Sequence, residues 1–148
     1  MNKLKIKSGD WIVVCDGRKA VILENAGDDV FPNLRTKEVR EHADARTSAQ
    51  GTDAPGRVHT SVGTARSSVE QTDWHDEAER EFLEALAKRL DAALTAGETK
   101  TLFMVAAPRA LGMIRRVYSP AVRAALKAEI DKDYVKLPVH EIEKRLIG

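Results

Sequence analysis

Two short apolar runs mark the N-terminal part of the chain. Residues Trp11–Cys15 and 19–24 are rich in Val and Ile, and an Asp-Gly-Arg triplet at 16–18 separates them. An Asp-Gly pair between two such runs indicates a β-hairpin, because Gly adopts positive φ without steric cost. A third strand is predicted over residues 34–42, where charged residues outnumber apolar ones. That polarity is typical of a strand at the edge of a sheet.

Residues 43–72 carry few large apolar side chains and show no periodicity. A segment of this composition buries little surface, so we expect a long flexible loop there, either functional or disordered. Asp73 is predicted to cap the helix that follows, because acidic side chains crowd the first turns and favour the positive end of the helix dipole. Apolar residues then recur at helical spacing until Gly97 ends the helix.

The C-terminal third of the chain begins with a continuous apolar run at residues 101–106, which predicts a buried central strand. Four segments follow it: helices over 108–116 and 119–127, a strand or helix extension over 128–135, and a short helix over 138–147. Ser119 before Pro120 places a capping hydroxyl in front of a proline at the first helical position.

The predicted order is therefore βββαβααβα, in a single α/β domain over residues 1–148. Parallel neighbours in a sheet need crossover helices, so we expect a mixed five-stranded sheet with helices on both faces. Trp11–Cys15 should lie in the middle of the sheet, parallel to residues 101–106, because both runs are almost entirely apolar.

Composition narrows the class of protein. The 148 residues include 24 Lys and Arg and 23 Asp and Glu, with a formal charge of +1. This balance excludes a membrane protein, a coiled coil and a strongly basic nucleic-acid binder. No apolar run is long enough for a signal peptide or a membrane span, and the lone Cys15 fits a reducing compartment. We therefore expect a cytoplasmic protein.

Five blocks of sequence resemble the bacterial host attachment protein family, whose domain is similar to the central domain of the archaeal and eukaryotic peptide-chain release factor. The blocks are Trp11-Ile-Val-Val-Cys-Asp-Gly-Arg-Lys-Ala20, Gly51-Thr-Asp-Ala-Pro-Gly-Arg-Val58, Arg66-Ser-Ser-Val-Glu-Gln-Thr-Asp-Trp-His75, Val105-Ala-Ala-Pro-Arg-Ala-Leu-Gly112, and Glu129-Ile-Asp-Lys-Asp-Tyr134 with Pro138-Val-His-Glu-Ile-Glu143. Together they span almost the whole chain in order. The resemblance implies a ribonuclease-H-like α/β fold.

This sequence lacks the residues that catalysis on such a fold would require. The release factor uses a Gly-Gly-Gln in the loop before its first helix, and no Gly-Gly-Gln occurs here. Two-metal hydrolysis needs three or four converging carboxylates, and residues 105–109 at the end of the central strand contain no acid. Gly51 and Gly56 have phosphate-loop spacing, but Arg57 and Val58 stand where Lys and a hydroxyl residue are needed. We expect no enzyme, no catalytic residues and no cofactor.

For the candidate metal ligands and nucleophiles, the sequence favours structural roles over chemical ones. His75 and Glu79 stand one helical turn apart, which suits a metal ion, but the other three histidines are scattered and give no second cluster. Cys15 lies within an apolar run, where packing is the usual role of a thiol. We expect no metal site.

Basic side chains concentrate in one part of the chain. Residues 108–128 contain five cations and no acid, whereas residues 73–91 contain seven acids and three bases. Arg109 and Arg116 are about two helical turns apart, on one face with Gly112. The residues expected to contact an anion or RNA are Arg57, Arg109, Arg115, Arg116, Arg123 and Lys127. A solvated face that balances the acidic helix is the structural alternative.

These observations favour a non-catalytic binding or adaptor protein of the host attachment family. The alternative, which the similarity to the release factor implies, is a translation-associated RNA or ribosome binder without peptide-release activity. The partner is a protein in the first case and RNA or a ribosome in the second, and the sequence leaves the oligomeric state open.

Overall fold

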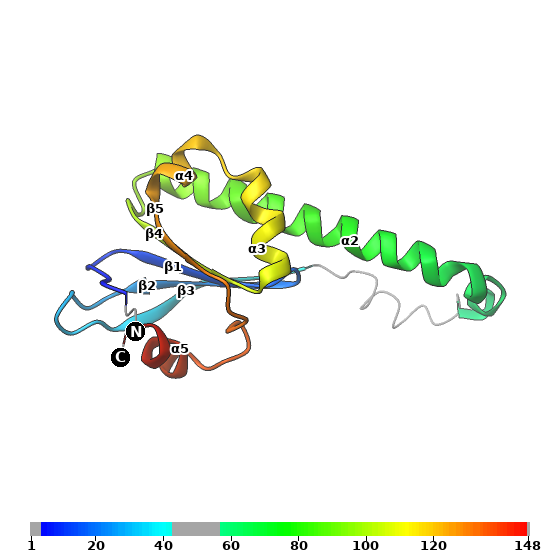
Figure 1. The fold of residues 1–148 in the computed structure, drawn as a ribbon, viewed down its shortest axis with the longest axis horizontal. Coiled ribbons are helices and arrows are strands. Elements are labelled where there is room, and N and C mark those ends of the chain that lie inside the picture. Colours follow the sequence, from blue (N-terminus) through cyan, green and yellow to red (C-terminus); the bar gives the residue numbers. More distant parts are fainter. Residues whose placement is uncertain (1–3, 43–56, 148) are drawn as a thin grey trace.

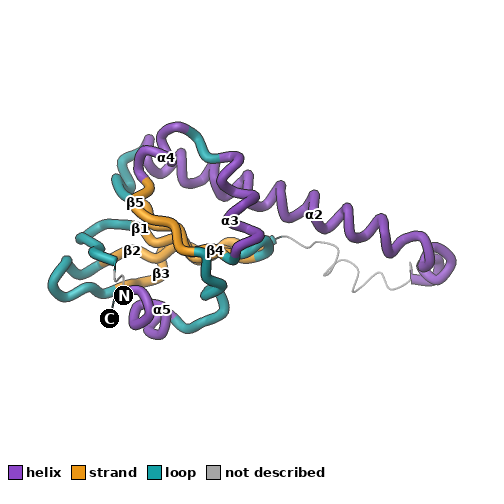
Figure 2. Tube along the Cα trace, in the orientation of Figure 1, coloured by secondary structure: helices purple, strands orange, loops and turns teal. Residues whose placement is uncertain are grey.

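The computed structural model describes residues 4–42 and 57–147, and of residues 57–75 it describes the backbone alone. Within these ranges the chain forms a single α/β domain with five strands and four α-helices (Figures 1 and 2). The strands are β1 (Trp11–Cys15), β2 (Lys19–Asn25), β3 (Leu34–Glu41), β4 (Leu102–Ala106) and β5 (Leu126–Ile130). The helices are α2 (Arg57–Thr95), α3 (Pro108–Ile114), α4 (Pro120–Ala125) and α5 (Val139–Leu146), with a 3-10 helix, η2 (Arg115–Val117), that the predicted order lacks.

The sheet is mixed, with the strand order β3-β2-β1-β4-β5. β1 pairs antiparallel with β2 and parallel with β4, so that Trp11 faces Leu102 and Cys15 faces Ala106 across the ladder. The prediction that Trp11–Cys15 is a central strand parallel to the 101–106 run is confirmed. The polar strand β3 lies at one edge, also as predicted.

Apolar side chains cover both faces of the sheet. Trp11, Val13 and Cys15 point to one face, where they pack against α2, α3 and α4. Ile12 and Val14 point to the other face and pack against α5, because successive strand residues alternate between faces. Helices therefore lie on both sides of the sheet (Figure 1). The ribonuclease-H-like assignment of this arrangement stays a prediction.

Helix α2 starts sixteen residues earlier than the sequence pattern indicates. It begins at Arg57, so Asp73 lies inside the helix, and the predicted loop over 43–72 is wrong for residues 57–72. The first part of that loop, residues 43–56, lies outside the described residues. Residues 57–72 lack apolar periodicity. Extending an existing helix nevertheless costs far less free energy than nucleating a new one, so the helix formed by the amphipathic residues 73–95 can continue into them. In Figure 1 this N-terminal half of α2 extends well beyond the sheet.

The second correction concerns the segment predicted as a helix over 119–127. Helix α4 ends at Ala125, and β5 begins at Leu126, which pairs with Leu102 of β4. The register then shifts, and Phe103 pairs with Ala128, so Lys127 lies at an irregularity of the strand rather than on a helix. Pairing with a buried strand overrides the helical tendency of Leu and Lys in this segment.

The predicted hairpin between β1 and β2 is present, but its turn works differently from the prediction. Asp16 Oδ1 accepts hydrogen bonds from the backbone N–H groups of Arg18 and Lys19, each at 2.8 Å. Gly17 does not have positive φ, which among the described residues is confined to Gly9 and Gly97. The Asp16 side chain, rather than the freedom of a glycine, therefore forms this turn.

Candidate functional site

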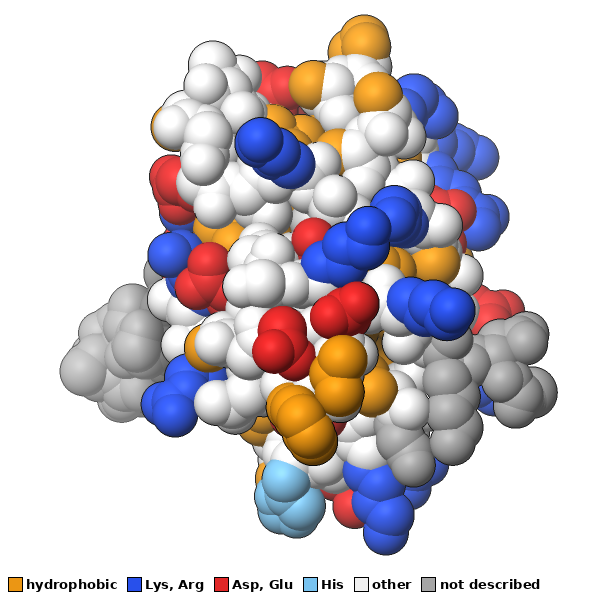
Figure 3. Space-filling model, turned by 90° about the vertical axis from the view of Figure 1, so that its left-hand side faces the viewer, with side chains coloured by type: hydrophobic (Ala, Val, Ile, Leu, Met, Phe, Trp, Pro, Cys, Tyr) orange, Lys and Arg blue, Asp and Glu red, His pale blue; other side chains and the backbone are white. Residues whose placement is uncertain are grey.

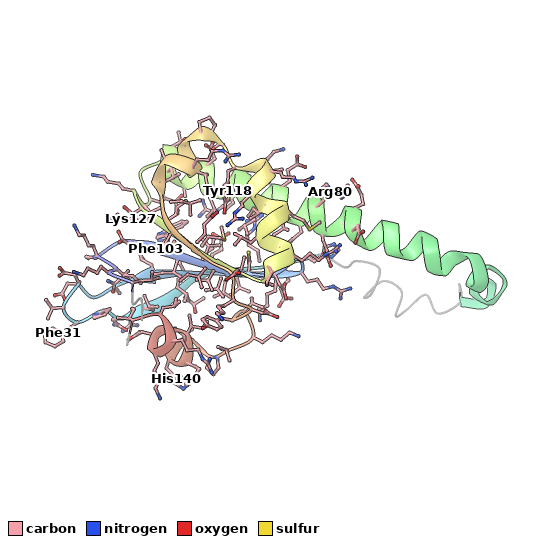
Figure 4. All side chains as sticks on the ribbon, in the orientation of Figure 1. Phe31, Arg80, Phe103, Tyr118, Lys127 and His140 are labelled. Atoms are coloured by element: carbon pink, nitrogen blue, oxygen red, sulfur yellow. The ribbon has the colours of Figure 1, made fainter. Side chains whose placement is uncertain are left out.

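One hollow beside the basic segment lies between η2, α4 and β5. Its volume is about 520 Å³. We call it the basic hollow, and its lining residues are Arg115, Tyr118, Arg123, Leu126, Lys127, Ala128 and Glu129. Figure 4 labels Tyr118 and Lys127, which mark its position on the α4 side of the sheet. The early end of α4 and the start of β5 at Leu126 bring Lys127 into this hollow beside the two arginines.

Glu129 organises the inner side of the basic hollow. Its Oε1 atom pairs with the Arg115 guanidinium at 3.0 Å, and its Oε2 atom accepts a hydrogen bond of 2.9 Å from the Tyr118 hydroxyl. Burial, and then the hydrogen bond to Glu129, raise the pKa of Tyr118 well above its usual range, so the phenol stays a proton donor at physiological pH. The charge of Arg115 is thus largely balanced from within the protein.

Arg123 and Lys127 provide the outward-facing charge of the basic hollow. Arg123 donates a hydrogen bond of 3.0 Å from Nη2 to the Arg115 carbonyl, and its guanidinium lies 5.8 Å from the centroid of the Tyr118 ring. These contacts fix the position of the guanidinium, while both Arg123 and Lys127 remain exposed. Neither side chain has an ion-pair partner among the described residues.

A second hollow lies between α2 and α3, on the other side of η2. Its volume is about 370 Å³. We call it the arginine-rimmed hollow, and its lining residues are Asp76, Arg80, Arg109, Gly112, Met113, Arg116 and Val117. Arg109, Gly112 and Arg116 therefore line the same hollow, but Arg116 lies in η2 rather than on the helix face with Arg109 that the sequence predicted.

The arginines of this second hollow differ in how far they are engaged. Arg109 pairs with Asp76 and, at 3.3 Å, with Glu79 of α2. The hydrogen bond that Arg109 donates to Glu79 and the charge of Asp76 raise the pKa of Arg109. Arg80 pairs with Glu77 at 2.6 Å, whereas Arg116 has no ion pair within the described part of the chain. The rim therefore carries local ion pairs together with one cation that the described acids leave unpaired.

The six predicted contact residues are thus divided between two hollows. Arg115, Arg123 and Lys127 line the basic hollow, and Arg109 and Arg116 line the arginine-rimmed hollow. The side chain of Arg57 lies outside the described residues. Sequence reasoning missed Tyr118 and Glu129, which shape the basic hollow, and Arg80, which rims the other. The run from Arg115 to Lys127 gave no sign that an acid two residues further on would fold back onto it.

The carboxylates near the strand ends serve the backbone. Asp10 accepts a hydrogen bond of 2.8 Å from the Lys7 N–H, and Asp16 forms the hairpin turn described above. Among the described residues, no group of three or more His, Cys, Asp and Glu side chains is placed to hold a metal ion. The side chain of His75 lies outside the described residues, and its predicted neighbour Glu79 pairs with Arg109.

Cys15 is fully buried, and its Sγ lies 3.9 Å from Met104 Sδ. Burial, with a smaller contribution from the charge of Asp16, raises the pKa of the thiol to about 12. The thiol is therefore protonated at physiological pH and packs as an apolar group, as the sequence predicted.

The sequence matches the model of a known protein family. The model of a family described as "Protein required for attachment to host cells" matches residues 11–146. The matched range runs from the first residue of β1 to the last residue of α5. No curated protein matches the sequence. Among the helices described, none is long and apolar enough to cross a membrane.

Proposed function

Because the chain belongs to the family of proteins required for attachment to host cells, we propose that it is a non-catalytic adaptor that binds an acidic segment of a partner protein through the basic hollow. The observation that carries this proposal is the gathering of Arg115, Arg123 and Lys127 around one hollow of about 520 Å³. An adaptor serves attachment by holding a partner, which needs a surface and no reaction.

The geometry of Arg123 supports a carboxylate ligand. Its guanidinium is already positioned by the Arg115 carbonyl and the Tyr118 ring, so less side-chain entropy is lost when an anion binds. A guanidinium also matches the two oxygens of a carboxylate with two parallel hydrogen bonds. Lys127 adds a second, exposed cation on the same hollow.

The surroundings of the hollow favour a protein over RNA. Tyr118, the aromatic residue of the lining, is only 7% exposed and is covered by Arg123, so its ring offers no face on which a base could stack. Glu129 places a carboxylate in the same hollow, and the whole chain carries a formal charge of only +1. RNA binding usually draws on a larger excess of positive charge.

A translation-associated RNA or ribosome binder is the second candidate, and the absence of any acid from residues 108–128 favours it. In that function Arg109 and Arg116 would extend the contact across η2. The similarity to the central domain of release factors belongs to this candidate. In either function we place the protein in the cytoplasm, because Cys15 is a solitary thiol.

Fluorescence anisotropy with two probes tests the proposal: a short labelled polyglutamate peptide and a labelled poly(U) of equal charge. The variant Arg123→Glu with Lys127→Glu reverses the hollow, and Lys132→Glu with Lys136→Glu makes the same charge change on exposed residues outside it. We expect the hollow variant to bind the peptide about tenfold or more weakly than the wild type and the control variant to bind within about threefold of it.

Both variants should melt near the wild-type temperature, because exposed charges contribute little to stability. Binding of poly(U) but not of the peptide, with an affinity that falls steeply from about 50 to about 200 mM salt, would favour the RNA or ribosome binder over the adaptor. Failure of the wild type to bind either probe, or equal loss in the two variants, would rule out the basic hollow as the contact surface.

A further inference from the structure

The loop between β2 and β3 carries two large apolar side chains that are exposed to solvent. Val30 is 69% exposed and Phe31 is 77% exposed. We call these two residues the apolar tip. Figure 4 shows Phe31 at the far end of the loop, pointing away from the body of the molecule. Single exposed apolar residues are common on protein surfaces, so exposure alone does not indicate a binding site. The hydrogen bonds that hold the loop supply the further evidence.

A buried asparagine holds the base of this loop. Asn25 is 1% exposed, and its Oδ1 accepts hydrogen bonds from the N–H groups of Gly27 and Asn33 at 2.9 and 2.8 Å. Its Nδ2 donates to the carbonyls of Ile6 and Asp28 at 3.1 and 3.2 Å. All the hydrogen-bonding groups of one amide therefore join the two sides of the loop to the N-terminal segment.

The apex of the loop is held by Asp28. Its Oδ1 accepts hydrogen bonds from the N–H groups of Val30 and Phe31 at 3.0 and 2.7 Å. The backbone also closes tightly, since a β-carbon on Gly27 would lie 2.1 Å from the Phe31 carbonyl oxygen. The tip is thus presented on a preorganised loop, and a preorganised aromatic side chain loses little conformational entropy when it binds.

The charge beside the tip restricts its partner. Asp28 and Asp29 precede the tip directly and are exposed. In Figure 3, hydrophobic and acidic side chains lie side by side in the lower half of the face shown. The complementary surface is an apolar pocket with a positively charged rim.

The arginine-rimmed hollow of the same chain has this chemistry. Gly112, Met113 and Val117 supply a small or apolar lining. The rim holds three arginines beside Asp76, and of these Arg80 and Arg109 pair with acids of α2, whereas Arg116 has no ion pair among the described residues and is the cation left for the acids beside the tip. Its volume of about 370 Å³ lies within the ordinary range for pockets that take a small apolar group. Figure 4 places Phe31 at the left end of the molecule and Arg80 well away from it, part-way along α2, so the tip does not reach its own hollow.

We propose that the apolar tip of one copy binds the arginine-rimmed hollow of a second copy, head to tail. Such a contact uses two different surfaces and leaves a free tip and a free hollow at the ends of each assembly, so the chain grows into rings or filaments rather than stopping at a dimer. A single loop buries little area, which makes the contact weak and concentration-dependent. The basic hollow is not involved, so this inference stands apart from the proposed function.

Sedimentation velocity of the wild type tests the growth of the assembly. Between about 10 µM and about 1 mM protein at low salt, the average mass should rise with concentration beyond that of a dimer. It should fall again at about 0.5 M salt, because the acids and arginines at the contact are solvent-exposed and screened.

Two variants each remove one of the two surfaces and should leave the fold intact. Phe31→Ser removes the apolar tip. Gly112→Glu places a carboxylate in the hollow, and it should fold because none of the described residues lies within 4 Å of a β-carbon at this exposed helical position. Each variant alone should be monomeric, but an equal mixture should form dimers and nothing larger, since one intact tip can meet one intact hollow. Val39→Ser, which removes another exposed apolar side chain, should assemble like the wild type.

The proposal is overturned if the wild type stays monomeric throughout, or if the mixed variants fail to pair. Association that stops at a dimer and survives in Gly112→Glu would assign the tip to a symmetric contact instead. Binding of the wild type but not Phe31→Ser to phosphatidylcholine vesicles, without self-association, would assign the tip to a lipid surface and equally overturn it.

Discussion

Gly17 and Glu79 approach each other so closely that a β-carbon on Gly17 would lie 2.7 Å from the carboxyl carbon of Glu79. Glu79 in turn pairs with Arg109, 3.3 Å away. The turn between β1 and β2 is thereby in contact with α2, and α2 with the start of α3. Gly17, which the sequence pattern assigns to a hairpin turn, thus has a second role, because it leaves room for an acid 62 residues further along the chain.

Gly17→Ala and Gly27→Ala should differ sharply in stability. The alanine at position 17 meets only the flexible end of Glu79, which can move, and Gly17 does not need positive φ. We expect a free energy of unfolding within about 1 kcal/mol of the wild type. The alanine at position 27 meets the Phe31 backbone and should cost about 1–3 kcal/mol. Urea unfolding measures both, and equal values would show that close approach to backbone does not decide the cost.

Stability at acid pH should depend on Arg89. It pairs with Glu38 and Glu98, each at 3.0 Å. Burial raises the pKa of Glu38, but hydrogen bonds from Arg40 and Arg89 lower it by more, and the hydrogen bond from Arg89 lowers the pKa of Glu98. Because both folded-state values lie below the ordinary 4.5, the folded chain binds fewer protons than the unfolded chain. The stabilisation is present above that pH and is lost as the pH falls through the lowered values.

The variant Arg89→Met should therefore lose stability at neutral pH and show a shallower decline from about pH 5 to about pH 3. Arg80→Met is the matched control, because Arg80 pairs with Glu77 at the surface, where both side chains are more than half exposed and ion pairs contribute little. Urea unfolding over this pH range provides the measurement. Parallel declines in the wild type and Arg89→Met would contradict the role assigned to Arg89.

Cys15 should be inert in the folded protein. Burial holds its pKa at about 12, so almost no thiolate exists at about pH 8, and an aromatic disulfide reagent has no access to the sulfur. Reaction should become fast and complete in guanidinium chloride. Stability should also fall as the pH rises above 9.0, the ordinary value of the thiol, since only the unfolded chain then loses the proton. Rapid labelling of the native protein would show that β1 opens readily.

Ser119→Ala should loosen the start of α4. Ser119 Oγ accepts a hydrogen bond of 3.1 Å from the Val122 N–H and donates one of 2.6 Å to Asp91 of α2. Loss of both should cost about 1–2 kcal/mol, while Ser119→Thr keeps the hydroxyl and should retain most of the stability. The urea midpoint at constant slope is the measurement. Equal stability of Ala and Thr would mean that Pro120 alone sets the start of the helix.

The central part of the fold could be predicted because local pattern and tertiary structure agree there. Trp11–Cys15 and the 101–106 run are apolar at every position, which suits strands covered on two faces. The pattern failed where distant partners decide the structure. Leu126 becomes a strand residue because Leu102 is available to pair with it, and the N-terminal half of α2 is helical without an apolar stripe.

The basic residues of the candidate sites were visible in the sequence, but their neighbours were not. Charge counting finds Arg115 and Lys127, whereas the acid that balances Arg115 is Glu129, on the next strand. The apolar tip was also missed, since Asn25 and Asp28 look like ordinary turn residues. Their hydrogen bonds to Asn33, Ile6 and Phe31 exist only in the folded loop.

The pairing of Trp11 with Leu102 also bears on synthesis at the ribosome. β1 emerges early, but its parallel neighbour β4 follows only after the whole of α2 has been made. Until then the three-stranded meander has only α2 to cover Val13 on one face, and α5, which covers Val14 on the other face, has not yet been made. Nascent chains that expose such surfaces aggregate or recruit chaperones. A ribosome stalled before β4 should therefore hold an aggregation-prone intermediate, and a chain truncated before β4 should precipitate.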